Sequence, residues 1–135
     1  MKKLLSIIII ASFTLLSGCE KSTDSFSSSL TGEWIWLKSC SGFDLISSTP
    51  ESTGKNRKLV FTTDSICQQY ENEVLKYSLT FHTYKYISQS GNDTIDILKF
   101  DGSNIQNSFS IRRDSLILIQ YFVIDNSISY YKRKK

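Results

Sequence analysis

The chain has 135 residues and a formal net charge of +3, from 16 basic and 13 acidic side chains. This length allows one domain of ordinary size and excludes a two-domain enzyme. A surface so close to neutral gives no electrostatic basis for binding nucleic acid. Aromatic residues make up 13% of the chain and charged residues 21%, with one proline, a composition typical of a folded domain rather than a disordered chain.

The first 18 residues have the pattern of an export signal. Lys2 and Lys3 form a short basic segment, and an apolar run follows from Leu4 to Leu16. This run is shorter than the roughly 20 residues needed to span a bilayer, so a cleaved signal is favoured over a permanent transmembrane helix. Removal of residues 1–18 would leave 117 residues with 14 basic and 13 acidic side chains, a net charge of +1.

The apolar run ends in Leu16-Ser17-Gly18-Cys19, which resembles the lipobox of bacterial lipoproteins. The resemblance implies cleavage before Cys19 and acyl chains such as palmitate on that residue, which together make a stable membrane anchor. The alternative is an ordinary secretory signal followed by an unrelated cysteine. Residues 19–31 would then be the lipidated cysteine and a serine-rich tether. We expect a location in the bacterial cell envelope, at the outer membrane or cell surface rather than the inner membrane.

Residues 32–135 are predicted to form one all-β domain, because period-two alternation recurs in short segments separated by turn-forming residues. The alternation is clearest from Val74 to His82, where Leu75, Tyr77, Leu79 and Phe81 are expected to face the core. Residues 84–89 either continue that strand past a bend or begin a new one. The predicted strands are 33–39, 57–63, 66–70, 74–82, 84–89, 94–100, 105–112, 116–123 and 127–133.

All connections after residue 56 are short, which favours sequential hairpins. A meander of eight or nine strands has two open edges unless it closes, so we predict a single small antiparallel up-and-down β-barrel. A two-sheet sandwich is the alternative, but sandwiches usually contain long crossover connections. The exception is the long loop from Cys40 to Asn56. Its apolar residues Phe43, Leu45 and Ile46 either close the barrel mouth over a ligand or fold back and plug the barrel.

Gly32-Glu33-Trp34, early in the first strand and before a long loop, resembles the Gly-X-Trp signature of lipocalins. Together with the terminal Tyr130-Tyr131-Lys132-Arg133 and short pieces at residues 49–54, 58–61 and 114–118, it is similar to the small lipocalin-like lipoproteins of Bacteroidetes. The resemblance implies that Trp34 plugs the closed end of the barrel and that Arg133 lies across its ring in a cation–π contact. It also implies a barrel interior with room for a small apolar ligand.

The expected ligand contacts are aromatic and aliphatic side chains on the inner face of the barrel and in the first loop. The candidates are Trp36, Phe43, Leu45, Ile46, Phe61, Tyr70, Tyr77 and Phe81. We expect a monomer whose partners are the membrane, through its lipid, and this ligand. The other hypothesis is an interaction or inhibitor module of the envelope with a solid barrel, which a large exposed apolar patch would favour.

Cys40 and Cys67 remain once Cys19 is acylated, and an even pair in an exported protein invites a disulfide. Alternation argues against the bond. Cys40 has the same parity as Trp34 and Trp36 on its strand, whereas Cys67 has the parity opposite to Ile66 and Tyr70. If the aromatic residues face inward, the two thiols therefore lie on opposite sides of the barrel wall. Because parity often breaks at strand ends, a disulfide and two buried free thiols both stay open.

Residues for catalysis are few, and an enzyme is the least favoured class. His82 is the only histidine and is expected on the exposed, polar face of its strand. The aspartates fall in turns, where turn chemistry accounts for them. A structural zinc site needs four ligands, more than two cysteines and one histidine supply. No phosphate-binding glycine loop or dinucleotide fingerprint is present in the sequence, so we expect neither metal nor cofactor.

Overall fold

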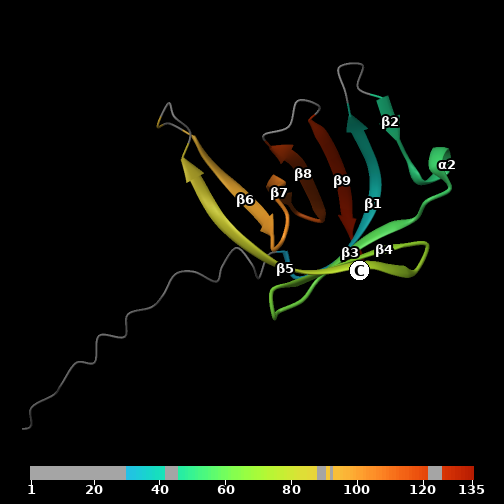
Figure 1. The fold of residues 1–135 in the computed structure, drawn as a ribbon. Coiled ribbons are helices and arrows are strands. Elements are labelled where there is room, and N and C mark those ends of the chain that lie inside the picture. The colour runs from blue at the N-terminus through green and yellow to red at the C-terminus, as the bar shows by residue number, and fades with distance from the viewer. Residues whose placement is uncertain (1–29, 42–45, 88–90, 92, 122–125) are drawn as a thin grey trace, which may run out of the picture.

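A computed structural model of the chain describes residues 30–41, 46–87, 91, 93–121 and 126–135. The predicted signal, Cys19 and residues 20–29 of the tether lie outside the described residues, as do Phe43 and Leu45. The elements, shown in Figure 1, are β1 (Gly32–Ser41), β2 (Ile46–Ser48), α2 (Pro50–Thr53), β3 (Arg57–Phe61), β4 (Ile66–Glu71), β5 (Val74–Ile87), β6 (Thr94–Phe100), β7 (Gln106–Arg112), β8 (Ser115–Tyr121) and β9 (Ser127–Arg133).

The strands form one antiparallel sheet that closes on itself. Its order is β2-β1-β3-β4-β5-β6-β7-β8-β9, and β1 pairs with β9 as well as with β3. The closing register runs from Trp34 opposite Arg133 to Ser41 opposite Ser127. The predicted small antiparallel up-and-down barrel is therefore confirmed, with β2 as an additional strand beside the end of β1.

Turn chemistry sets several strand limits where the sequence predicted them. β6 and β9 have the predicted bounds, and Gly102, with a φ of 74°, forms the predicted turn after β6. Residues 74–82 and 84–87 belong to a single strand, β5. That strand is long enough to pair with β4 through its first half and with β6 through its second half, as Figure 1 shows.

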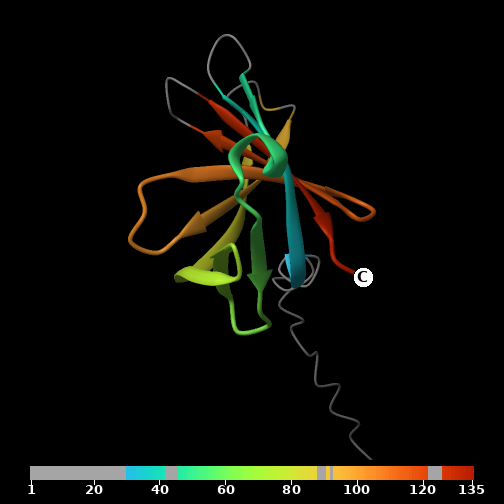
Figure 2. The same cartoon turned by 90° about the vertical axis from the view of Figure 1, so that its right-hand side faces the viewer.

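The first loop contains two elements that were not predicted, β2 and α2. α2 has a capping box, in which Thr49 accepts a hydrogen bond from the backbone N–H of Ser52 and the Ser52 side chain accepts one from the backbone N–H of Thr49. Pro50 begins this short helix, and Gly54, with a φ of 66°, ends it. In Figure 2, α2 lies on the outside of the barrel, next to β1.

The core lies inside the barrel and draws on most of its strands. Trp34 and Leu30 are fully buried at one end, and the rings of Phe61 and Phe81 meet edge to face with 5.1 Å between their centroids. The buried residues of the core are Leu30, Trp34, Leu59, Phe61, Cys67, Phe81, Leu98, Phe109, Leu116 and Leu118.

The expected burial of the first half of β5 is wrong for three of its four inward positions. Phe81 is 2% exposed, but Leu75, Tyr77 and Leu79 are between 38% and 60% exposed. β6 pairs only with residues 81–87 of β5, so within the described part of the chain the first half of β5 has β4 on one edge and no strand on the other. These side chains therefore lie where the described chain leaves one edge of β5 without a partner strand.

Candidate functional site in the barrel interior

One end of the barrel is sealed by the pair that the lipocalin resemblance implies. The guanidinium carbon of Arg133 lies 4.1 Å from the centroid of the Trp34 ring, and its Nη1 donates a 2.7 Å hydrogen bond to the carbonyl of Thr31. The indole Nε1 of Trp34 donates a hydrogen bond of 2.7 Å to the carbonyl of Leu30. We call this end of the barrel, where β1 begins and β9 finishes, the Trp34 end.

The other half of the interior contains a cavity of about 170 Å³, which we call the lumen cavity. Its lining comes from strands on several sides of the barrel, including the start of β7 and the start of β9, both away from the Trp34 end. The lining residues are Leu59, Gln69, Phe100, Asn107, Leu118, Ser127, Ser129 and Tyr131. The lining therefore mixes apolar side chains with amides and hydroxyls.

The polar side chains of the lumen cavity are neutral. Burial raises the pKa of Tyr131 to about 12, and a hydrogen bond with Ser129 offsets only part of that rise, so its phenol is protonated at neutral pH. Within the described part of the chain, neither Gln69 nor Asn107 has a hydrogen-bond partner for its side-chain amide, and the amide atoms of both are accessible to water. Two amides without protein partners thus face a cavity that carries no charge.

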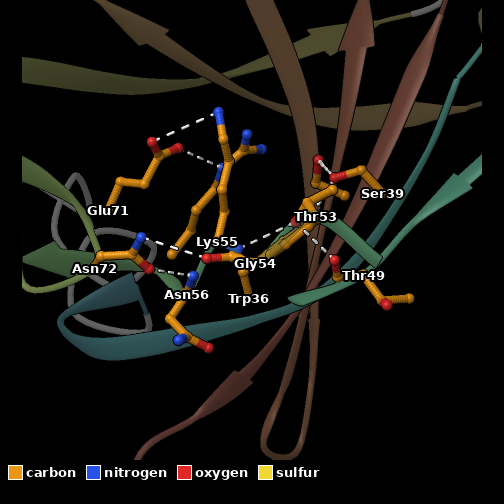
Figure 3. A network of polar contacts seen from close by, with 11 residues as sticks. Trp36, Ser39, Thr49, Thr53, Gly54, Lys55, Asn56, Glu71 and Asn72 are labelled. Carbon is orange, nitrogen blue, oxygen red and sulfur yellow. Dashed lines mark hydrogen bonds and ion pairs between the residues drawn. The ribbon is translucent and has the colours of Figure 1, made fainter. Parts of the chain in front are cut away.

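A polar network joins a lining residue of the lumen cavity to β1, and Figure 3 shows its members Trp36 and Ser39. The Nε1 of Trp36 donates a 2.8 Å hydrogen bond to the Ser39 hydroxyl, which is 2.7 Å from the hydroxyl of the lining residue Ser129. The Arg57 guanidinium lies 4.9 Å from the Trp36 ring centroid and donates a hydrogen bond to Glu71. This hydrogen bond from Arg57 lowers the pKa of Glu71.

The same network attaches the first loop to the hairpin of β4 and β5. The side-chain oxygen of Asn72 accepts a 2.8 Å hydrogen bond from the backbone N–H of Asn56, and the backbone N–H of Asn72 donates one of 2.7 Å to the Asn56 carbonyl. Lys55 forms an ion pair of 3.6 Å with Glu71. α2 is therefore held beside the barrel by contacts at its C-terminal end (Figure 3).

None of the described side chains predicted to contact a ligand lines the lumen cavity. Phe61 and Phe81 fill the core, and Trp36 is 1% exposed and engaged with Ser39 and Arg57. Tyr70 lies across from Lys58, whose ammonium is 4.8 Å from its ring centroid.

Ile46 and Tyr77 are 67% and 60% exposed, so both project away from the interior. The two remaining candidates, Phe43 and Leu45, lie outside the described residues.

Sequence reasoning missed the polar lining because it assigned polar positions of alternating strands to solvent. The signal was present in β9, where Ser127, Ser129 and Tyr131 alternate with Ile128 and Tyr130. Only the sheet register identifies the inward set, since Tyr131 lies opposite Trp36 and Leu116.

The disulfide between Cys40 and Cys67 is absent, and both cysteines are free thiols. The register explains why. Cys67 lies opposite Phe61 and faces the core, whereas Cys40 lies opposite Ile128, one position from the inward-facing Ser39. The two thiols are on opposite sides of the barrel wall, but the sides are the reverse of those that alternation predicted. Cys67 faces inward and Tyr70 outward, and the β-bulge between Trp36 and Lys38 turns Cys40 to the outer face.

His82 is exposed, and its Nε2 lies 3.0 Å from a carboxylate oxygen of Asp101. Among the described residues, no group of three or more His, Cys, Asp or Glu side chains is placed to hold a metal ion. No helix in the described part of the chain has the length and hydropathy to cross a bilayer.

A second depression, of about 270 Å³, lies over β6, β7 and β8. Its lining includes Ser108, Ser110, Ile117 and Ile119, which have the parity opposite to the cavity-lining Asn107 and Leu118, and also the core residue Phe109. The depression has no lining residue in common with the lumen cavity.

The chain matches no family model, and a comparison with curated protein sequences finds no significant match.

Proposed function

We propose that this chain is a bacterial envelope lipoprotein, anchored by acyl chains on Cys19, whose barrel binds one small neutral molecule in the lumen cavity. The anchor is supported by the basic segment, the apolar run and the Leu16–Cys19 motif of the sequence. The ligand is supported by one observation above all. The amides of Gln69 and Asn107 have no partners among the described residues and face a neutral cavity inside the barrel.

The size of the lumen cavity restricts the ligand to about one ring. Its volume is about 170 Å³, and an engineered cavity of about 150 Å³ in another protein holds benzene. Sites for drug-sized ligands are larger, on the order of 300–1,000 Å³. An extended acyl chain is therefore too large, and a compact molecule fits.

The lining favours a molecule with an apolar body and one hydrogen-bonding group. Leu59, Phe100 and Leu118 offer apolar contact, while the two amides offer donors and acceptors. An ionised ligand would lose its hydration and gain no opposite charge from the lining, which disfavours it. The purely apolar ligand expected from the resemblance is thus replaced, in this proposal, by a small amphipathic one.

Titration of the mature protein with phenol, benzene and benzoate tests this specificity, using NMR chemical shifts to follow binding. We expect phenol to bind at least about tenfold more tightly than either of the others, the ratio that corresponds to about 1.4 kcal/mol. In the Asn107→Leu variant, phenol should lose most of this preference over benzene. Equal binding of benzoate, or no binding of any of the three, would contradict the proposal.

A second candidate function is an interaction module of the envelope, favoured by the hairpin of β4 and β5. Leu75, Tyr77 and Leu79 are exposed there, beside the unpaired edge of β5 described above. Such an edge can accept an added strand from another protein. A photo-crosslinking residue at position 77 tests this in cells: one defined product that disappears in the Leu79→Lys variant supports the module, and diffuse labelling argues against it.

A further inference from the structure

Six cationic side chains gather around the Trp34 end of the barrel. The register places the turn between β7 and β8 beside the last residues of β9, because Ser115 pairs with both Arg112 and Lys132. The backbone N–H of Arg133 also donates a hydrogen bond to the carbonyl of Asp114. We call this set the basic end: Arg112, Arg113, Lys132, Arg133, Lys134 and Lys135.

Only part of this charge is neutralised by neighbours. Lys134 pairs with Glu33 at 3.0 Å and Lys135 with Asp114 at 3.7 Å, while Arg133 is stacked on Trp34. The other three members of the basic end are exposed and have no ion-pair partner within the described part of the chain; they are Arg112, Arg113 and Lys132.

The rest of the described chain is close to neutral. The six cations of the basic end form ion pairs with two carboxylates, whereas the other described residues contain seven basic and seven acidic side chains. One of those acidic residues, Asp64, follows β3 at the same end, because Phe61 lies opposite Gly32. The barrel is therefore electrostatically polarised, positive at the Trp34 end and close to neutral over the described remainder.

The local backbone does not account for a cation at Arg113. This residue occupies the turn between β7 and β8 with a φ of 54°, a left-handed conformation that Gly, Asn and Asp adopt more readily than Arg. Glu73 has the same conformation, with a φ of 64°, in the turn between β4 and β5. The backbone therefore tolerates a charged residue at such a turn without selecting its sign.

The basic end is also where the tether enters the barrel. Leu30, the first described residue, is joined to Trp34 by a hydrogen bond, and Arg133 bonds to the neighbouring Thr31. Cys19 precedes Leu30 by 11 residues, which span at most about 40 Å when fully extended. An anchor on Cys19 would therefore keep this end of the barrel near the bilayer.

We propose that the basic end docks on the anionic phospholipid surface of the bilayer that holds the anchor, and so fixes the orientation of the barrel. This inference rests on the proposed lipidation of Cys19. Each cation near such a surface strengthens binding about fivefold at low ionic strength, and the attraction is screened within about 8–10 Å at physiological salt. The lumen cavity, in the other half of the barrel, then points away from the membrane.

Lysine acetylation read by mass spectrometry tests this orientation in the mature lipoprotein. The protein is reconstituted in vesicles of phosphatidylcholine alone or with about 30% phosphatidylglycerol, an anionic surface of the kind that attracts basic segments. We expect labelling of Lys132, Lys134 and Lys135 to fall at least about threefold on the anionic vesicles and to recover in high salt. Lys55 and Lys99, which lie away from this end, should label equally on both.

Two triple variants make the test specific. The first variant removes the unpaired cations through Arg112→Ser, Arg113→Asn and Lys132→Thr. Asn is chosen at position 113 because it suits the positive φ of the turn. In this variant, the protection of Lys134 and Lys135 from acetylation on anionic vesicles should at least halve. The control variant removes the same charge elsewhere through Lys55→Ser, Lys85→Thr and Lys99→Thr. It should leave the protection of Lys134 and Lys135 from acetylation unchanged. Equal labelling of the terminal lysines on both vesicles, or equal effects of the two variants, would overturn the proposal.

The intact mass separates this inference from the anchor on which it rests. A mass without acyl chains on Cys19 would remove the proposed anchor. The protein without acyl chains can then be added to preformed vesicles. If the basic end is a membrane-binding surface, this protein should sediment with anionic vesicles and not with neutral ones. Absence of sedimentation together with equal lysine labelling would remove the basic end as well.

Discussion

Gly32 is the residue on which the packing of the Trp34 end depends most directly. Its φ of 126° lies in a region that other residues rarely adopt, and an added Cβ would be 2.9 Å from Nη1 of Arg133. The glycine of the Gly-X-Trp motif thus leaves room for the guanidinium that covers Trp34.

We predict that Gly32→Ala destabilises the fold by about 1–3 kcal/mol, the range for a residue held in a strained backbone conformation. The variant should also change the near-ultraviolet circular dichroism, because Arg133 must move from the Trp34 ring. Urea unfolding and the spectrum measure the two effects. Gly102→Ala is the matched control: its φ is 74°, but no atom lies within 4 Å of the added Cβ, so its spectrum should not change.

A buried thiol and a partly buried phenol in the interior make stability depend on alkaline pH. Burial raises the pKa of Cys67 from 9.0 to about 12 and that of Tyr131 from 10.0 to about 12. Above pH 9 the unfolded chain loses these protons while the folded chain keeps them, so stability is complete below that pH and is lost as the pH rises toward 12.

The expected slope between these values is about 1.4 kcal/mol per pH unit for each proton released. Urea unfolding at a series of alkaline pH values measures it. Cys67→Ala should reduce the slope from pH 9 upward, because the folded chain then no longer holds this proton. A slope unchanged by Cys67→Ala would show that this thiol is not shielded from water.

At the scale of elements, β5 shows where sequence patterns suffice and where they do not. Its alternation identified a strand, and the turn residues around β6 and β9 fixed their limits, because both signals are local. Burial is not local: Tyr77 and Phe81 have the same parity on β5, yet one lies on the exposed hairpin and the other meets Phe61 in the core. The sequence carries no record of where β6 ceases to pair with β5.

Substitutions at these two positions should therefore differ sharply. Phe81→Ala removes a ring that is 2% exposed and should cost about 3–5 kcal/mol. Tyr77→Ala removes one that is 60% exposed and should change the free energy of unfolding by less than about 1 kcal/mol. Similar losses in urea unfolding would mean that the hairpin of β4 and β5 packs against the rest of the domain.

At the scale of the whole molecule, the barrel was predictable and its interior was not. Short connections and recurring alternation indicate a closed meander, and the Gly-X-Trp resemblance placed Trp34 and Arg133 together. The lumen cavity depends instead on which polar residues the register turns inward. Gln69, Asn107 and Tyr131 come from three strands that are distant in the chain, so no spacing in the sequence connects them.

Polar inward residues also give the two halves of the barrel different properties. The Trp34 end is filled by an indole and a guanidinium, and the other half contains a neutral cavity with unpartnered amides. The proposed ligand site therefore lies in the half of the barrel that the Trp34–Arg133 pair does not fill.

The most direct test of the account is a native mass spectrum of the mature protein purified from bacterial envelopes. We predict a discrete added mass on the order of 100–200 Da, the size that a cavity little larger than one for benzene admits. It should disappear on denaturation and be absent from the Asn107→Leu variant purified in the same way. A bare protein mass in repeated preparations, or an added mass that the variant retains, would contradict ligand binding in the lumen cavity.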